Sequence, residues 1–508
     1  MGEAPLVLAV DVGSTSVRAS VYDARARPVP DSLVRRPSAI RLDRAGAAEA
    51  DPEALARLVE EVVDEALRRQ GSRAGRIDAV GLDTLTFTAC GVDGRGAPLT
   101  PLYTYADARS SDDVAALRHE LDGLAVYQRT GCPLHTSYMP ARLRWFARTQ
   151  PAAAGAVRRW LDFGTFLHGR WLGRRDAPVS YSVASWSGLL DRARLAWDEG
   201  LLRHLDVPEE ALPQLADYSD AQRGLSPDFA TRWPTLRETP FFLAVGDGAS
   251  ANVGSGCVSA HQVALTVGTT GAMRVVIPDR VPPVPPGLWA YKVGASETLL
   301  GGAFSEGGNV FAWAVETLRL PPKDGLEAAL RSLAPDGHGL TVLPFISGER
   351  SPGWSSNARA AIAGLTASTT GAEVLQALLE AVCYRFALVA RLLRGHVDPD
   401  HEIVASGGAM SRSPYWAQLM ADVIGHRVRL SRETELTSRG TAILALRALG
   451  VWGGLDDERL EAAAVHEPDP TRVAVYQAAL ERQHRLYDAL IGHEAEIGAS
   501  LSAALRPE

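Results

Sequence analysis

Lysine is almost absent from this chain. Only Lys292 and Lys323 occur among 52 lysine and arginine residues in a chain of 508 residues. The phosphate loop of P-loop proteins depends on a lysine that directly follows a glycine-rich turn. Neither lysine stands in such a place, so this class of nucleotide-binding loop is excluded.

Cysteine is scarce as well. The four cysteines, Cys90, Cys132, Cys257 and Cys383, lie far apart and form no CxxC pair. We therefore expect buried free thiols in a reducing compartment rather than disulfides or a metal site. The twelve histidines show no HExxH or paired spacing, so zinc held by the protein is not indicated.

Long apolar runs and a basic excess are also missing. No stretch reaches the roughly 20 apolar residues that span a bilayer, and Asp11 interrupts the first apolar run, so we expect no signal peptide. The net charge of −8 argues against a broad nucleic-acid footprint. These features predict a cytoplasmic, globular protein without membrane or nucleic-acid partners. Its length predicts two domains.

One short pattern occurs twice, in residues 6–21 and 263–277. Each copy has an apolar strand, a turn of glycine and hydroxyl residues, and a second apolar strand. This pattern is typical of a β-hairpin whose turn directs backbone N–H and hydroxyl groups at an anion. The two turns consist of Gly13, Ser14 and Thr15, and of Gly268, Thr269 and Thr270. Two such turns indicate two lobes that close on a polyphosphate, which points to nucleotide chemistry.

Two aspartates stand next to these patterns. Asp11 ends the first strand, where a carboxylate beside phosphates is repulsive unless a divalent cation lies between them, so it is a candidate Mg²⁺ ligand. A turn-forming aspartate is the alternative. Asp247 lies between Gly246 and Gly248, where it could accept the proton of an attacking hydroxyl in phosphoryl transfer. An aspartate that caps a helix is the alternative there.

Other segments suggest where ligands lie. Residues 406–411 and 301–309 are glycine-rich and could border a nucleotide along the backbone, although a Gly-Gly turn alone is also typical of a structural loop. In residues 105–109 an aromatic ring, a carboxylate and a guanidinium suit a hydroxyl-rich substrate. A plain ion pair between Asp107 and Arg109 is the alternative.

The remaining pattern is of strands alternating with helices. We expect a helix that begins after Asp51, helical stretches at 140–146 and 157–171, and a surface connection at 207–240. A second α/β series starts near Phe241 and contains a long helix from near Gly371 to Arg394.

Taken together and in this order, these segments resemble the FGGY family of carbohydrate kinases over nearly the whole chain. Residues 11–18 and 267–271 resemble its phosphate motifs, 406–411 its adenosine motif, and 343–353 with 364–366 its signature region. The resemblance implies an α/β, two-domain actin/hexokinase-like (ribonuclease H-like) ATPase fold with the active site in the interdomain cleft. The implied domains are residues 1–253, with the sugar site, and 254–508, with the adenosine site.

The resemblance also implies the roles of residues. The reaction would be transfer of the γ-phosphate of ATP to a hydroxyl of a sugar or sugar acid, with Asp247 as the base and Asp11 organising Mg²⁺. The nucleotide would be bound by Gly13, Ser14, Thr15, Arg18, Gly268, Thr269, Thr270, Gly308, Gly408, Ala409 and Arg412. The substrate would be bound by Thr84, Phe87, Tyr105, Asp107 and Asp247. Whether the protein forms a homodimer is left open.

Residues 100–109 and 179–185 look most like the gluconate kinase branch, so a gluconate-like substrate is favoured, and a ketopentose or polyol such as xylulose is the alternative. Two residues depart from the family pattern: Phe87 stands where relatives carry histidine, and Tyr105 where they carry tryptophan. A hydrocarbon ring in place of a polar group should change which hydroxyl pattern is accepted.

Two further functions stay open at this point. One is a sugar-independent nucleotide switch, such as an actin-like filament subunit or a chaperone-type ATPase, which needs the two hairpins but no sugar site. The other is a relative that binds sugar without turnover.

Overall fold

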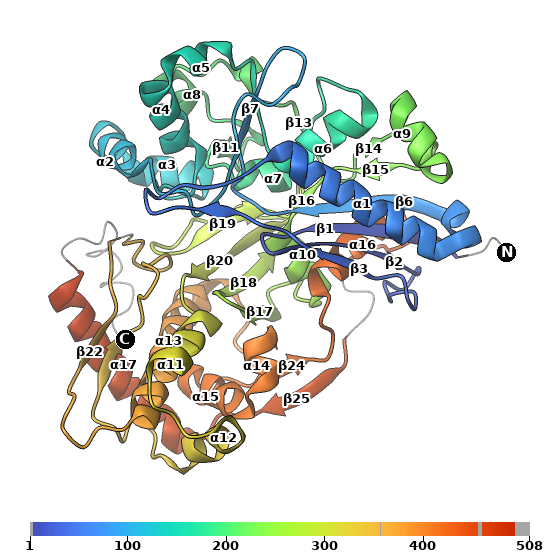
Figure 1. Cartoon of the computed structure of the whole chain (residues 1–508). Helices are drawn as coiled ribbons and strands as arrows, with labels where there is room; N and C mark the ends of the chain where they lie inside the picture. The colour runs from blue at the N-terminus through green and yellow to red at the C-terminus, as the bar shows by residue number, and fades with distance from the viewer. Residues whose placement is uncertain (1–3, 356, 456–459, 493–508) are drawn as a thin grey trace.

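The computed structural model describes residues 4–355, 357–455 and 460–492. Two seven-stranded sheets form its centre, one from each half of the chain. In Figure 1 the first half, from blue to green, lies above the second, from yellow to red. Among the described residues, none of the helices combines the length and the hydrophobicity of a membrane-spanning segment.

The first sheet is built around a hairpin. Its order is β14 (Ala221–Gln222), β15 (Phe241–Phe242), β6 (Ile77–Thr84), β1 (Leu6–Val12), β2 (Ser16–Tyr22) and β3 (Val34–Pro37), and β16 (Val245–Gly246) also pairs with β6. Strand β1 runs antiparallel to β2 and parallel to β6. All seven residues of β1 are buried, as expected for a near-continuous apolar strand covered on both faces.

The second sheet repeats this plan. Its order is β19 (Trp289–Lys292), β20 (Thr298–Phe304), β18 (Gly271–Ile277), β17 (Gln262–Val267), β23 (Glu402–Ser406), β24 (Val428–Ser431) and β25 (Ala462–His466). Strand β17 runs antiparallel to β18 and parallel to β23, as β1 does with β2 and β6. The repeated sequence pattern therefore marks a repeated sheet core.

The long helices begin where the sequence predicts. The carboxylate of Asp51 accepts hydrogen bonds from the amides of Glu53 and Ala54 at the start of α1 (Pro52–Gln70), with proline in the first turn. Helix α13 (Gly371–Leu393) begins with a complete capping box between Thr370 and Glu373. Apolar side chains on these helices cover the two sheets.

Shorter elements complete the two halves. The other helices are α2 (Ser111–Glu120), α3 (Gly123–Thr130), α4 (Met139–Thr149), α5 (Pro151–Ala156), α6 (Phe163–Leu172), α7 (Tyr181–Ser185), α8 (Glu199–His204), α9 (Pro227–Arg232), α11 (Gly308–Thr317), α12 (Lys323–Ser332), α14 (Gly408–Arg412), α15 (Pro414–Ile424) and α17 (Pro470–Leu490). The minor strands are β4 (Arg41–Leu42), β5 (Ala48–Ala50), β7 (Cys90–Val92), β8 (Leu102–Tyr103), β9 (Arg159–Leu161), β10 (Val179–Ser180), β11 (Leu190–Asp191), β12 (Ala196–Trp197), β13 (Leu215–Ala216), β21 (Thr341–Leu343) and β22 (Ala361–Ala363).

Two further helices cross between the sheets: α10 (Asp247–Gly254) and α16 (Leu436–Ala448). A Cβ atom built on Gly440 would lie 1.8 Å from the carbonyl oxygen of Ser250, and one on Gly254 would lie 1.8 Å from that of Leu436. Helix α16 also packs on β1 and β6, although it belongs to the second half of the chain (Figure 1). Glycine at these two positions therefore allows the close contact between α10 and α16 that joins the two halves of the chain.

Two details differ from the sequence-based expectation. Residues 159–161 form strand β9 instead of the predicted helix, because they pair with β7, and the helix begins only at Phe163. The segment 207–240 is not only a surface connection, since it adds β14 to the sheet edge and buries Trp233. All four cysteines are free and buried, as predicted.

Candidate active site

Three carboxylates meet at the ends of neighbouring strands. Asp11 on β1 lies opposite Asp83 on β6, and Asp83 in turn lies opposite Val245 on β16. Asp247 follows β16 directly as the first residue of α10. Because parallel strands end at the same edge of a sheet, three aspartates from distant parts of the sequence come together there.

Partners from the hairpin and from α16 hold two of these carboxylates. Arg18 on β2 donates from Nη1 to Asp11 Oδ2 at 2.9 Å, and Ser438 Oγ donates to the same oxygen at 3.2 Å. Thr441 Oγ1 donates to Asp83 Oδ2 at 2.6 Å. Helix α16 therefore reaches across from the second half of the chain to position both groups.

Burial raises the pKa values of all three carboxylates. Burial raises the pKa of Asp247 to about 6, and the charge of Asp11 adds to this effect. Burial, with the charge of Asp11, also holds the pKa of Asp83 well above its ordinary value, and its buried Oδ1 has no hydrogen-bond partner among the described residues. Carboxylate oxygens are the ligands that a hard divalent cation such as Mg²⁺ prefers. Asp11 and Asp83 would hold it.

In each predicted turn the amide of the glycine donates a hydrogen bond within the turn. The amide of Gly13 donates to the carbonyl of Ser16 at 3.0 Å, and that of Gly268 to the carbonyl of Thr270 at 2.9 Å. The amide of Gly308 also donates to Gly268 at 2.8 Å. The residues of both turns are at least partly exposed, which leaves their remaining polar groups accessible.

A cavity of about 560 Å³ lies beside the second turn. Six residues predicted to bind the nucleotide line it: Gly268, Thr269, Gly308, Gly408, Ala409 and Arg412. Phe311, Leu326 and Trp416 add an apolar wall. Gly407 has a φ of +99°, and a Cβ there would lie 2.3 Å from the carbonyl oxygen of Val267, so only glycine lets this loop cross β17. The size and polarity suit a planar base with its ribose.

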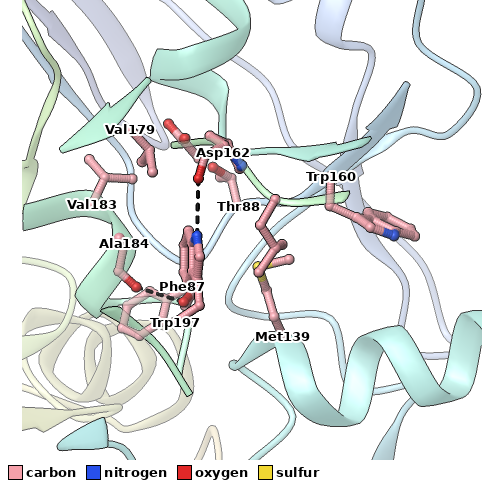
Figure 2. A pocket seen from close by; sticks show the side chains of 12 residues that line it. Phe87, Thr88, Met139, Trp160, Asp162, Val179, Val183, Ala184 and Trp197 are labelled. Atoms are coloured by element: carbon pink, nitrogen blue, oxygen red, sulfur yellow. Dashed lines mark hydrogen bonds between the residues drawn. The ribbon is translucent and has the colours of Figure 1, made fainter. Parts of the chain in front are cut away.

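Aromatic rings gather on the other side of Asp247. The ring of Phe87 makes edge contacts with Trp186, at 5.1 Å between centroids, and with Tyr138 and Tyr291. Phe87 also lines a small void of about 20 Å³ with Met139 and Trp160 (Figure 2). Its φ of +62° is unusual for a non-glycine residue. Phe87 thus contributes an apolar ring, and no polar group, to this part of the molecule.

The ring of Trp186 explains the glycines that flank Asp247. A Cβ on Gly246 would lie 2.7 Å from Trp186 Nε1, and one on Gly248 would lie 2.9 Å from the Trp186 ring. Trp186 in turn stacks on Tyr291 at 3.8 Å between centroids. Asp247 is therefore placed against an aromatic surface, which is the type of surface on which sugar C–H groups pack.

The other residues predicted to bind the substrate differ in how far they are buried. Asp107 is buried, and its carboxylate accepts hydrogen bonds from Arg109 and from the amide of Ala48. Arg109 also pairs with Glu49 at 2.8 Å, so the ion pair of the alternative is present, and the role of Asp107 in substrate binding stays a prediction. Thr84 is fully buried, and Thr86, two residues further on, is also buried; its hydroxyl acts to lower the pKa of Asp247. Tyr105 is partly exposed, with its ring 6.4 Å from that of Phe87.

Sequence reasoning missed several residues of this region: Asp83, Thr86, Trp186, Arg274, Arg350, Ser438 and Thr441. Arg274 had a visible signal, because it is the one charged residue in the apolar strand β18. Ser438 and Thr441 had none, since nothing local marks an α16 hydroxyl as the partner of a distant aspartate.

Among the described residues, one set of metal-ligand types lies elsewhere: Asp336, His338 and Glu380. Nδ1 of His338 accepts a hydrogen bond from the amide of Leu340 at 2.9 Å, and Nε2 lies 3.0 Å from Glu380. A neutral histidine that accepts at Nδ1 carries its proton on Nε2, so it donates to Glu380. This arrangement is a buried hydrogen-bond network rather than a metal site.

Two family models match the chain. The model of the FGGY family of carbohydrate kinases, N-terminal domain, matches residues 6–254, and the model of the C-terminal domain matches residues 263–449. The gluconokinase of Bacillus subtilis is 27% identical over 462 residues, which cover 89% of each chain. A glycerol kinase of Allorhizobium ampelinum is 30% identical over 465 residues, covering 89% of this chain and 91% of that protein.

Solved structures show the same fold. The gluconate kinase from Lactobacillus acidophilus has a TM-score of 0.89 at 24% identity, covering 99% of this chain and 100% of the other. A ligand-bound xylulose kinase from the same organism also has a TM-score of 0.89 at 24% identity, covering 96% and 98%. The predicted two-domain actin/hexokinase-like α/β fold is thereby confirmed.

Proposed function

The chain belongs to the FGGY family of carbohydrate kinases, and we propose that it transfers the γ-phosphate of ATP to a hydroxyl of a sugar acid resembling gluconate, with Asp247 as the general base. The observation that carries this proposal is the place of Asp247. It lies between the aromatic group around Phe87 and the carboxylates at the phosphate side: its flanking glycines pack on Trp186, and the charge of Asp11 helps to raise its pKa. A carboxylate so placed can accept the proton of a hydroxyl that attacks phosphorus.

The two turns and the cavity would hold the donor. The adenosine would lie in the 560 Å³ cavity between Gly308 and Arg412, and the turns at 13–15 and 268–270 would approach the phosphates from opposite sheets. Because phosphoryl transfer depends mainly on positioning and charge stabilisation, backbone donors and Arg18 suit it without a P-loop lysine. Bound Mg²⁺ would neutralise charge on the phosphates.

This assignment gives the two halves of the chain different binding roles. We infer that residues 1–253 form the domain that contacts the acceptor and that residues 254–508 form the domain that contacts adenosine. Asp247 lies at the start of α10, where the first domain ends. Closure of the domains would exclude water and so limit ATP hydrolysis.

ADP release tests this function. We expect the purified protein to turn over ATP slowly alone and at least tenfold faster with an accepted sugar acid, sugar or polyol, because a bound acceptor supplies the hydroxyl that Asp247 deprotonates. The measurement is coupled ADP detection over a panel of polyols, ketoses and sugar acids. Hydrolysis that no acceptor changes would instead indicate a nucleotide switch, and binding without turnover would indicate a relative that has lost catalysis.

A pH profile tests the role of Asp247. Its pKa is raised to about 6 by burial and by Asp11, so the ionised form that can accept a proton prevails only above that pH. We expect kcat/KM for the acceptor to fall about tenfold per pH unit below about pH 6 and to level off above it, because this ratio reports the ionisation of the free protein. Initial rates at acceptor concentrations well below KM, measured across this pH range, would show the fall. The residual activity of Asp247→Asn should lack it, and a wild-type profile that stays flat through pH 6 would contradict the assignment.

A further inference from the structure

We propose that Arg274 and Arg350 form an anion subsite beside Asp247, which holds the carboxylate of a sugar acid and makes the protein select aldonates over neutral sugars and alditols. This inference rests on the proposed function, because it names the acceptor class of the same site. Both side chains are partly exposed, like Asp247, Phe87 and Tyr105 around them.

Strand β18 directs Arg274 toward Asp247. Its Nη1 lies 3.4 Å from the carbonyl oxygen of Gly248, the residue after Asp247, which is a long contact for a guanidinium. Gly301 on the neighbouring strand β20 makes room for its stem, since a Cβ there would lie 3.0 Å from Arg274 Cγ. The guanidinium therefore reaches the acceptor side of Asp247 with most of its donors uncommitted.

Arg350 reaches the same region from the signature segment. Its Nη2 donates to the carbonyl oxygen of Phe304 at 2.5 Å, and its guanidinium lies 5.8 Å from the ring centroid of Tyr105. The preceding Glu349 does not neutralise it, because that carboxylate is bound by Arg385 and by Tyr487. One edge of Arg350 is thus fixed, and its charge acts against the raised pKa of the buried Glu306 carboxyl without forming an ion pair with it.

The charge balance distinguishes these two arginines. Of the residues that the structure describes, none forms an ion pair within 4.0 Å with either of them, whereas other partly buried arginines such as Arg109 and Arg447 have carboxylate partners. Burial lowers the pKa of Arg274 to about 10; the charge of Asp247 acts against this lowering, and the charge of Arg350 adds to it, as expected for two neighbouring cations. Unpaired neighbouring cations are costly, and a ligand carboxylate would pair with both.

Neither of the two arginines lines the 560 Å³ cavity assigned to adenosine, and Arg350 lies over the ring of Tyr105. The charge of Arg350 also helps to lower the pKa of buried His135 to about 3, after burial and Arg118. His135 is therefore neutral and supplies no charge. The side chain of Phe87 cannot hydrogen-bond a hydroxyl either, and the nearby hydroxyls of Tyr138 and Tyr291 are bonded to each other at 2.7 Å.

Matched acceptors test the subsite. D-gluconate, D-xylonate and D-erythronate are each compared with the alditol of the same configuration, which replaces only the carboxylate by a hydroxymethyl group. We expect wild-type kcat/KM to be at least about 100-fold higher for the best acid than for its alditol. The reason is that charge-assisted hydrogen bonds from two arginines to a carboxylate are stronger than the neutral hydrogen bond that a hydroxymethyl group can form.

Variants locate the effect. We expect Arg274→Gln and Arg350→Gln each to lower kcat/KM for the acid by about 10- to 100-fold, mainly through KM, with little change in KM for ATP or in the alditol rate. Arg274→Lys should recover part of the loss. Arg432→Gln, in an exposed ion pair with Glu461, is the control and should match wild type.

The outcomes separate the subsite from the proposed function. Phosphorylation of alditols or ketoses in preference to every acid would overturn the subsite while the kinase stands. A raised KM for ATP in the glutamine variants, or an equal loss with acids and alditols, would also overturn it. If no acceptor stimulates ADP release, the kinase function itself fails. Should Arg274→Gln not fold, Arg350→Gln and Arg274→Lys decide the question with the same readouts.

Discussion

Replacement of Asp247 by asparagine is expected to lower kcat by about 10²- to 10⁴-fold, the usual contribution of a general base. Asparagine has nearly the same shape, and its amide oxygen can still accept the hydrogen bond that the amide of Gly248 donates to Asp247 at 2.8 Å. It cannot take up a proton from the attacking hydroxyl. ATP binding should persist, because the residues that line the 560 Å³ cavity do not include Asp247.

The measurement is kcat by ADP release together with ATP affinity by calorimetry. Asp228→Asn, at an exposed position in the first turn of α9, is a matched control and should behave as wild type. Turnover near wild-type levels in Asp247→Asn would rule out the base assignment. Loss of ATP affinity in that variant would instead place Asp247 on the donor side.

The features that the sequence predicts correctly are those specified locally. Each hairpin shows its apolar strands and its glycine-hydroxyl turn within about 15 consecutive residues, and α1 shows its cap at Asp51 and its first-turn proline. The repetition of the hairpin could be recognised without knowledge of the fold. The resemblance then supplied the arrangement of the two sheets, which no local pattern contains.

The contacts around the carboxylates could not be predicted in this way. Thr441 meets Asp83 across 358 residues, and Ser438 meets Asp11 across 427. Such pairs depend on how α16 crosses β1 and β6, which is a property of tertiary packing. The group at residues 105–109 shows the opposite problem: its composition suits a sugar, yet Asp107 is buried against Arg109. Composition alone does not tell a ligand site from an internal ion pair. The roles assigned to single residues stay predictions.

Replacement of Gly440 by alanine is the other change with a large expected effect. The added Cβ would lie 1.8 Å from the carbonyl oxygen of Ser250 and 2.8 Å from the amide nitrogen of Gly254. These are backbone atoms of α10, so no side-chain rotation can relieve the overlap. The helices must move apart, and we expect the free energy of unfolding to fall by about 1–3 kcal/mol, as for other overpacked cores.

The same displacement should reduce catalysis in the fraction that stays folded. Helix α16 carries Ser438 and Thr441, which hold Asp11 and Asp83, and α10 carries Asp247, so both sides of the site shift when the crossing opens. Because misplacement by about 1 Å can cost about 100-fold in rate, we expect kcat to fall at least tenfold at temperatures where the variant is fully folded.

Thermal and denaturant unfolding, with kcat measured well below the melting temperature, would separate the two effects. Gly325→Ala on α12 is the matched control, because a Cβ there meets nothing within 4 Å and alanine favours the helix. It should leave kcat unchanged and stability equal or slightly higher. If Gly440→Ala kept both wild-type stability and wild-type kcat, the crossing would not be what holds the three carboxylates in register, and the alignment of Asp247 with Asp11 and Asp83 would have to come from the first sheet alone.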